Sequence, residues 1–148
     1  QPAHGDIGTV LATLRYRLQD RMQAAGIAVD WQVDELPAWE CLTMERVLHL
    51  QRIILEAFTN VLRHSGADRL AVVCTERPGD PPELELVVED NGHGLPGEGA
   101  RRGQGLANMA ARASAIGARL QVGSLPGRGT RVHLRLPLDR GPARSAPD

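Results

Sequence analysis

The sequence predicts an α+β fold, a two-layer sandwich in which helices cover one face of a mixed, mainly antiparallel sheet. Hydrophobic residues recur along the chain with helical and strand periods in the order α-β-α-β-β-α-β-β. Two pairs of strands are separated only by short turns, residues 78–82 (PGDPP) and 126–129. The pattern does not show a regular parallel β-α-β alternation. With 148 residues, the chain has the length of one ordinary domain.

The first half of the chain contains two helical patterns around one strand. Apolar residues with helical spacing run from Val10 to Ala25, and Gly26 suits the end of that helix. Residues 27–33 alternate between apolar and polar side chains, as in a half-buried strand. Residues 43–65 form the longest helical pattern, with a threonine in the N-cap position.

The second half predicts four strands around one further helix. Residues 70–74 and 84–90 alternate as strands on either side of the first turn. Residues 106–116 return to helical spacing, and the glycine that follows them closes the helix. Residues 120–122 and 130–136 predict the two last strands.

Composition excludes several classes of function. The 17 basic and 18 acidic residues leave a formal charge of −1, and only four residues are aromatic, so we expect no direct binding to nucleic acid. All basic residues are arginine, which excludes a Walker A lysine and a Schiff-base lysine. No apolar run approaches the roughly 20 residues that span a bilayer. We expect residues 6–138 to form the domain, residues 1–5 to be a linker and residues 139–148 to be a disordered tail.

The longest helical pattern carries a polar stripe. Arg52, Glu56, Asn60 and His64 follow one another at i+4 spacing and therefore line one face of the helix. Such a stripe alone is more often a solvated face with ion pairs. The alternative is a carboxylate and an amide that point into a pocket, because the carbonyl oxygen of asparagine is a good ligand for Mg²⁺.

The segment 89–94 (EDNGHG) places a carboxylate at the end of an apolar strand. Asp90 can accept a hydrogen bond from an exocyclic amine such as that of adenine, and Gly92 and Gly94 let the backbone pass close to a flat base. Taken alone, the segment is more often a tight turn. Residues 92–97 also match G-x-G-x-x-G literally, but Pro96 and further glycines stand where a helix would have to begin. Residues 110–116, about 20 positions on, contain no acidic residue, so we reject a dinucleotide-binding motif.

Two further glycine motifs follow. Gly103-Gln104-Gly105-Leu106 leads into a helix, whose free N–H groups suit a polyphosphate in a chain without lysine. The motif 127–130 (GRGT) enters the last strand, and the hydroxyl of Thr130 is placed to reach a base edge. The alternatives are a solvated loop for the first motif and an ordinary β-forming threonine for the second.

In order and spacing, these segments resemble the N, G1 and G2 boxes of the GHKL ATPase superfamily. The match extends over residues 7–138 and is closest to the ATP-binding domain of two-component sensor histidine kinases of the nitrate/nitrite-sensor subgroup. The stretches that carry this resemblance are residues 50–67, 103–120 and 124–138.

The resemblance implies a Bergerat-type ATP-binding fold that binds ATP and Mg²⁺. It assigns Mg²⁺ ligation to Asn60, adenine recognition to Asp90, and to Glu56 the catalytic role of orienting water near the metal. Thr130 would help to hold the base. The remaining nucleotide-binding residues that it implies are Arg63, His64 and Leu106, with Gly92, Gly94, Gly103 and Gly105 framing a mobile ATP lid.

The resemblance also implies partners. Such kinases phosphorylate a histidine on an upstream helix, usually followed by an acidic residue. Here only His4-Gly5-Asp6 has that order, without a helical pattern, and we interpret His4 as part of a linker. The acceptor is therefore expected on a histidine-bearing dimerisation domain of the same full-length protein, which signals to a response regulator with a helix-turn-helix output domain.

We expect the isolated domain to be a cytoplasmic monomer that does not autophosphorylate, and the full-length protein to be a homodimer. Whether the full-length protein is anchored in the bacterial inner membrane stays open. Two alternatives also stay open: an anti-sigma-factor-type serine protein kinase, and a non-catalytic nucleotide-binding module.

Overall fold

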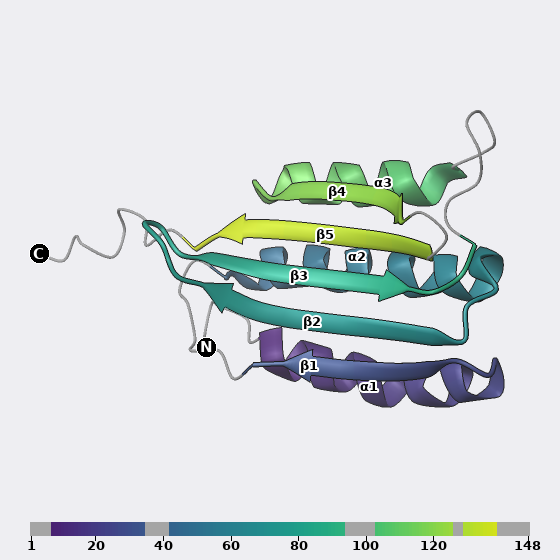
Figure 1. Ribbon diagram of the computed structural model, residues 1–148. Helices are drawn as coiled ribbons and strands as arrows, with labels where there is room; N and C mark the ends of the chain where they lie inside the picture. Colours follow the sequence, from purple (N-terminus) through teal and green to yellow (C-terminus); the bar gives the residue numbers. More distant parts are fainter. Residues whose placement is uncertain (1–6, 35–41, 94–102, 126–128, 139–148) are drawn as a thin grey trace, which may run out of the picture.

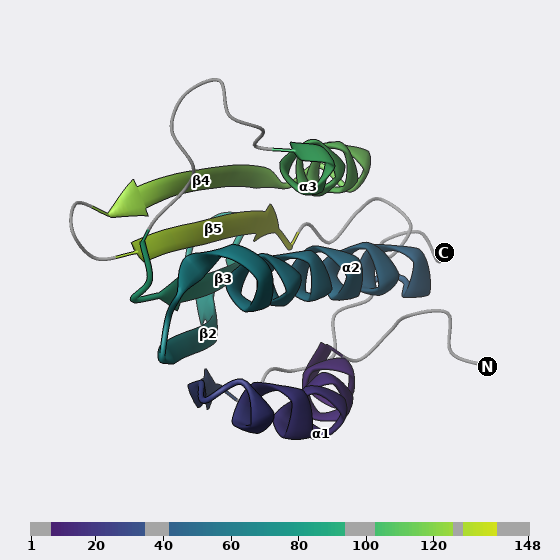
Figure 2. The same ribbon diagram turned by 90° about the vertical axis from the view of Figure 1, so that its right-hand side faces the viewer.

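The computed structural model describes residues 7–34, 42–93, 103–125 and 129–138, which form one sheet with a single layer of helices (Figure 1). The elements are α1 (Ile7–Ala24), β1 (Ala28–Val33), α2 (Met44–Asn60), the π-helix η1 (Val61–Ser65), β2 (Arg69–Arg77), β3 (Glu83–Asp90), α3 (Gly103–Ala115), β4 (Arg119–Leu125) and β5 (Gly129–Pro137). The strands are ordered β1-β2-β3-β5-β4, with β1 parallel to β2 and the other neighbours antiparallel. Seen edge-on, α1, α2 and α3 all lie on the same side of the sheet (Figure 2). The predicted two-layer α+β sandwich is confirmed.

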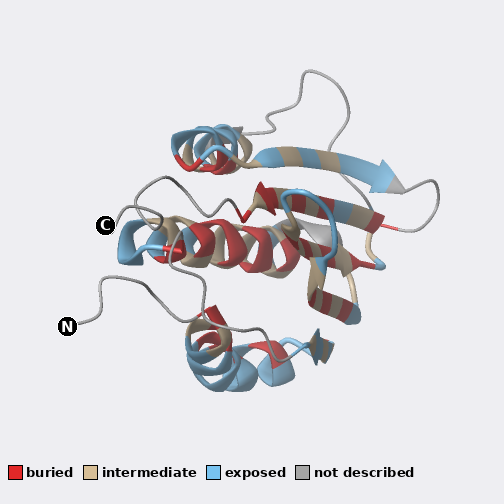
Figure 3. Ribbon diagram, turned by 90° about the vertical axis from the view of Figure 1, so that its left-hand side faces the viewer, coloured by how far each residue is buried: buried red, intermediate tan, exposed pale blue. Residues whose placement is uncertain are grey.

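The core lies between the sheet and the helices, as the buried residues in Figure 3 show. Along β3, buried and half-buried residues alternate strictly, so that one set of side chains faces the helices. Strand pairing aligns these sets: Val72 pairs with Val88, and Val88 with Val132. The last residue in the buried row of β3 is Asp90, opposite Leu70. The alternation of the strand therefore turns a carboxylate toward the helical layer.

The central helix α2 begins where the sequence predicts. The hydroxyl of Thr43 accepts a hydrogen bond from the backbone N–H of Arg46 at 3.2 Å, which satisfies one of the free donors of the first turn. Its end differs from the prediction of one continuous helix to residue 65. After Asn60 the backbone continues as the π-helix η1, closed by Gly66 with a positive φ of 66°. The apolar pattern persists through this change, so periodicity alone does not reveal it.

Two other boundaries test the predictions. Gly26 and Gly117 follow α1 and α3 with φ values of 77° and 75°, the left-handed conformation expected of a glycine that closes a helix. Helix α3, however, begins at Gly103, three residues before the predicted start near Leu106. Two glycines in its first turn obscure the start, because glycine is a weak helix former.

No helix in the described part of the chain is long and apolar enough to cross a membrane. The predicted linker (1–5) and the predicted tail (139–148) both lie outside the described residues.

Candidate functional site

The predicted site residues that the structure describes gather at one end of the sandwich. The carboxyl end of α2, the end of β3, the beginning of α3 and the beginning of β5 all lie at the same end in Figure 1. These elements carry, in turn, Glu56 and Asn60, Asp90, Gly105, and Thr130. The fold thus brings together four motifs that are separated in the sequence.

Asp90 is the one charged side chain in the buried set of the described residues, with 6% of its surface exposed. Its Oδ1 accepts a hydrogen bond from the backbone N–H of Gly92 at 2.8 Å, and the backbone N–H of Thr130 donates a second bond to the carboxylate. Burial raises the pKa of Asp90 above its ordinary value, and the two backbone donors counteract that rise. A buried acceptor is therefore held in a defined orientation at the end of β3.

The start of β5 lies directly against this carboxylate. Gly129 has a φ of 116°, and a Cβ at this position would collide with the backbone carbonyl of Asp90 and come within 2.8 Å of its Oδ1. Only glycine tolerates both this positive φ and the close approach of the Asp90 backbone. The sequence analysis proposed the hydroxyl of Thr130 as the contact to a base. The structure assigns a further role to the backbone N–H of Thr130, which is to hold Asp90.

The polar stripe of α2 divides in two. Glu56 and Asn60 are half-buried, whereas Arg52, which precedes them on the stripe, is exposed. The carboxylate of Glu56 lies so close to Gly105 that a Cβ there would collide with Oε2. Glu56 therefore faces the first turn of α3, and the fully solvated interpretation fits only the Arg52 end. Arg63 is exposed on η1, and the side chain of His64 lies outside the described residues.

Asn60 is the last residue of α2, at the point where the helix changes to π geometry. Among the described residues, no three His, Cys, Asp or Glu side chains come together as a metal site. The side-chain carbonyl oxygen of Asn60 is the kind of donor that Mg²⁺ takes, and Mg²⁺ typically keeps several waters and binds phosphate oxygens.

The predicted lid is described only in part. Gly94 and the arginines at 101 and 102 lie outside the described residues. Gly103 and Gly105 belong to the first turn of α3 rather than to a loop, and half-buried Leu106 packs against the core. The resemblance implies that both glycines frame the lid, and the structure places them at the start of a helix, whose first N–H groups have no partner within the helix.

Sequence reasoning missed one pair of residues at this end. The side chain of Asn91 bonds to both the backbone and the carboxylate of Asp68. Asn91 belongs to the motif 89–94, but Asp68 belongs to no motif that the analysis singled out. A hydrogen bond between residues 23 positions apart leaves no periodic trace in the sequence.

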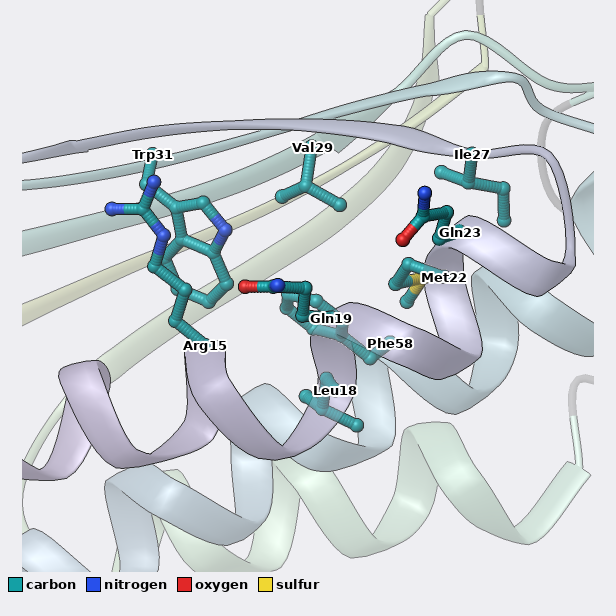
Figure 4. Close-up of a pocket in the computed structure, with 9 residues that line it drawn as sticks. All are labelled: Arg15, Leu18, Gln19, Met22, Gln23, Ile27, Val29, Trp31 and Phe58. Atoms are coloured by element: carbon teal, nitrogen blue, oxygen red, sulfur yellow. The ribbon is translucent and has the colours of Figure 1, made fainter.

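Hollows border strand β1, and one of them reaches the predicted site. A cavity of about 260 Å³ between α1 and β1 is lined by Trp31, Phe58 and Arg15, among others (Figure 4). The rings of Trp31 and Phe58 stack at 5.7 Å, and the Arg15 guanidinium lies 5.9 Å from the centre of the Trp31 ring. A wider hollow of about 830 Å³ lies along the ends of β1, β2 and β3 and includes Asp90 and Asn91 in its wall.

Burial and the charge of Asp34 raise the pKa of Cys74 to about 12, so this buried thiol is not a nucleophile at neutral pH.

Comparison with known proteins gives consistent matches. The family model described as "Histidine kinase-, DNA gyrase B-, and HSP90-like ATPase" matches residues 45–140. The sensor protein VraS of Staphylococcus haemolyticus is 41% identical over 93 residues, which cover 62% of this chain and 26% of that protein. VraS of Staphylococcus aureus strain COL is 40% identical over the same length. The chain thus spans about a quarter of the length of these relatives.

Two solved structures share the fold. The histidine kinase domain of the Erythrobacter litoralis EL346 blue-light activated kinase superposes with a TM-score of 0.72 at 24% identity, covering 93% of this chain and 65% of that one. The Acinetobacter baumannii histidine kinase AdeS superposes with a TM-score of 0.73 at 17% identity, covering 90% and 66%. At such identities the likeness concerns the fold.

Proposed function

Because this chain belongs to the family of histidine kinase-, DNA gyrase B- and HSP90-like ATPases, we propose that it is the ATP-binding catalytic domain of a bacterial sensor histidine kinase. The observation that carries the proposal is the buried carboxylate of Asp90, held by two backbone N–H donors at the end where the other motifs meet. The relatives named as sensor proteins favour a kinase over the other members of the family.

Asp90 accepts a hydrogen bond from the exocyclic amine of adenine. Burial makes this bond strong, because water competes poorly for an acceptor that is 6% exposed. The two backbone donors keep the Asp90 carboxylate in place, so fixing this side chain costs little conformational entropy when ATP binds. Gly129 leaves open the space beside Asp90 that any side chain would fill.

Asn60 and Glu56 serve the phosphate end. The carbonyl oxygen of Asn60 would hold Mg²⁺, and Glu56, one helical turn earlier, would orient a water near it. When bound, Mg²⁺ neutralises charge on the phosphate oxygens. The first N–H groups of α3 and the exposed guanidinium of Arg63 receive the phosphates, in a chain that has no lysine for this task.

The γ-phosphoryl group passes to a histidine on a dimerisation domain of the same full-length protein, and from there to a response regulator with a helix-turn-helix output domain. Catalysis rests on positioning and charge neutralisation, so the domain transfers little without its docked acceptor. The full-length protein acts as a homodimer, with this domain in the cytoplasm.

Calorimetry and radiolabelled ATP test the proposal together. The domain should bind ATP more tightly with Mg²⁺ than without it, and should incorporate no stable label alone. Addition of the parent protein's histidine-bearing helices should produce acid-labile label on those helices. Label on a serine of an added partner would instead favour the anti-sigma-factor-type kinase. Nucleotide binding without any transfer to the added helices would favour the non-catalytic module.

A further inference from the structure

We propose that Asn91 and Asp68 form a polar clamp that positions Asp90 for base recognition. The inference rests on the function proposed above, because it concerns how the adenine-binding carboxylate is held. Asn91 directly follows Asp90 at the end of β3, and Asp68 directly precedes β2. Both side chains are exposed, so neither is needed to fill the core.

The clamp uses both ends of one amide. Oδ1 of Asn91 accepts hydrogen bonds from the backbone N–H groups of Asp68 and Arg69, each at 3.0 Å. Nδ2 of Asn91 donates to Oδ1 of Asp68 at 2.8 Å. The carbonyl of Asp68 also accepts from the backbone N–H of Ala28 at 2.9 Å. Asp68 thus joins the starts of β1 and β2 to the end of β3.

The position of the clamp explains its role. The ladder between β2 and β3 ends with the pair Leu70 and Asp90. One residue further, the backbone N–H of Asn91 reaches the carbonyl of Arg69 at 3.3 Å, and the side-chain bonds of Asn91 reinforce this long contact. Gly92, whose N–H holds the Asp90 carboxylate, comes next. The clamp therefore fixes the backbone on which the orientation of Asp90 depends.

The clamp also ties the base end of the site to the metal end. Asp68 lies three residues after η1, which itself begins directly after Asn60. A second contact joins the same two segments: Gly66 has a φ of 66°, and a Cβ there would come within 3.0 Å of Cδ2 of His93. Segments 60–68 and 90–93 thus touch at two places, and the clamp is the polar one.

Reciprocal substitutions test the clamp. In Asn91→Asp, an oxygen replaces the donor that faces the Asp68 carboxylate, and the two negative charges repel. In Asp68→Asn an acceptor oxygen remains for Nδ2 of Asn91, so the effect should be small. In the double variant the carboxylate at 91 accepts from the backbone N–H groups and from the new amide at 68, which restores the clamp with its two side chains exchanged.

The measurement compares ATP with inosine triphosphate, which carries an oxygen in place of the exocyclic amine. Asn91→Asp should weaken ATP binding about three- to tenfold, the equivalent of one or two hydrogen bonds, and inosine triphosphate binding much less. The double variant should recover the ATP preference. Gln32→Glu is the matched control, because Nε2 of Gln32 donates to the Asp30 carboxylate at 2.9 Å on the edge strand β1, which does not pair with β3. It should leave the preference unchanged.

Equal losses for the two nucleotides, or a double variant no better than Asn91→Asp, would overturn the positioning role. A wild-type domain that binds neither nucleotide would refute the proposed function instead. Amide hydrogen exchange at Gly92 then decides the clamp independently: exchange should quicken in Asn91→Asp and slow again in the double variant. Unchanged exchange in Asn91→Asp would show that the pair holds nothing in place.

Discussion

The carboxylate of Glu56 occupies the space that a side chain at Gly105 would need, so α2 and α3 approach each other through a charged group and a glycine. Both residues lie at the end of the sandwich that carries Asp90. The contact joins two motifs that lie 49 positions apart by residue number (105 − 56). It accounts for a glycine inside the first turn of a helix, where alanine would otherwise be the better residue.

The first prediction follows from this contact. Gly105→Ala should displace the flexible Glu56 carboxylate while leaving the fold intact, because alanine gains about 0.5–1 kcal/mol of helix stability over glycine. Phosphotransfer to the added dimerisation helices should therefore fall while the melting temperature holds or rises. Gly123→Ala is the control, since nothing lies within 4 Å of a Cβ at that position. Equal phosphotransfer activity of Gly105→Ala and Gly123→Ala would show that Glu56 has no catalytic role.

The second prediction concerns Gly129. Gly129→Ala combines a φ of 116° with a collision against the backbone of Asp90, and backbone cannot move aside as a flexible side chain can. We expect a loss of about 2–5 kcal/mol in the free energy of unfolding. Gly117→Ala has a positive φ but open space around it and should lose only about 1–2 kcal/mol. Urea denaturation of both variants measures the difference. Similar losses in the free energy of unfolding would mean that the close contact between Gly129 and Asp90 does not add to the cost of the substitution.

The third prediction separates stability from function at Asp90. Burial raises the folded-state pKa of this carboxyl above its ordinary value of 3.8, so ionisation is more costly in the folded than in the unfolded chain. The stability that this group contributes is present at low pH and is lost as the pH rises through the folded-state pKa. Asp90→Asn should therefore fold at neutral pH at least as stably as the wild type.

The same variant should nevertheless bind ATP more weakly by about 1.5–3 kcal/mol, the value of a hydrogen bond to a charged group. Thermal melting without nucleotide and calorimetry with ATP measure the two effects. Unchanged ATP affinity in the folded variant would exclude adenine recognition by Asp90.

The fourth prediction concerns the metal. Asn60→Ala should weaken nucleotide binding in the presence of Mg²⁺ by at least about tenfold, because losses of that size follow even from changes to outer partners of metal ligands. Binding measured in EDTA should change much less. Arg52→Ala alters the exposed end of the same helix face and serves as control. If Asn60→Ala reduces binding equally with and without Mg²⁺, Asn60 is not a ligand.

The fifth prediction concerns the sheet face opposite the helices. Glu85 lies between Nε2 of His133 at 2.5 Å and the Arg77 guanidinium at 3.4 Å. Burial opposes ionisation of Glu85, but the hydrogen bond from His133 and the charge of Arg77 outweigh it and lower the pKa below 4.5. The stability from this carboxylate is therefore present above pH 4.5 and is lost as the pH falls through the folded-state value.

Glu85→Gln should accordingly flatten the acid limb of the stability curve below pH 4.5, by about 0.5–1 kcal/mol for a partly exposed pair. Denaturation at several pH values between 3 and 7 checks this against the wild type. Parallel curves for the two proteins would contradict the lowered pKa.

The sequence by itself determined those features that depend on one residue and its near neighbours. The start of α2 at Thr43 and the stops at Gly26 and Gly117 follow from local hydrogen bonding and from backbone angles that glycine tolerates. The alternation of residues 84–90 also predicted the strand that ends with the Asp90 carboxylate before any partner strand was known. Each of these signals is complete within a few consecutive residues.

Only the tertiary structure decided which distant residues meet. The strand order places β5 between β3 and β4, and it is this order that brings Gly129 and Thr130 onto Asp90. Helix packing sets Glu56 against Gly105, and the paired ends of β2 and β3 allow Asn91 to reach Asp68. The physical reason is that a hydrophobic period reports whether a residue is buried, whereas its contacts depend on how whole elements pack against one another.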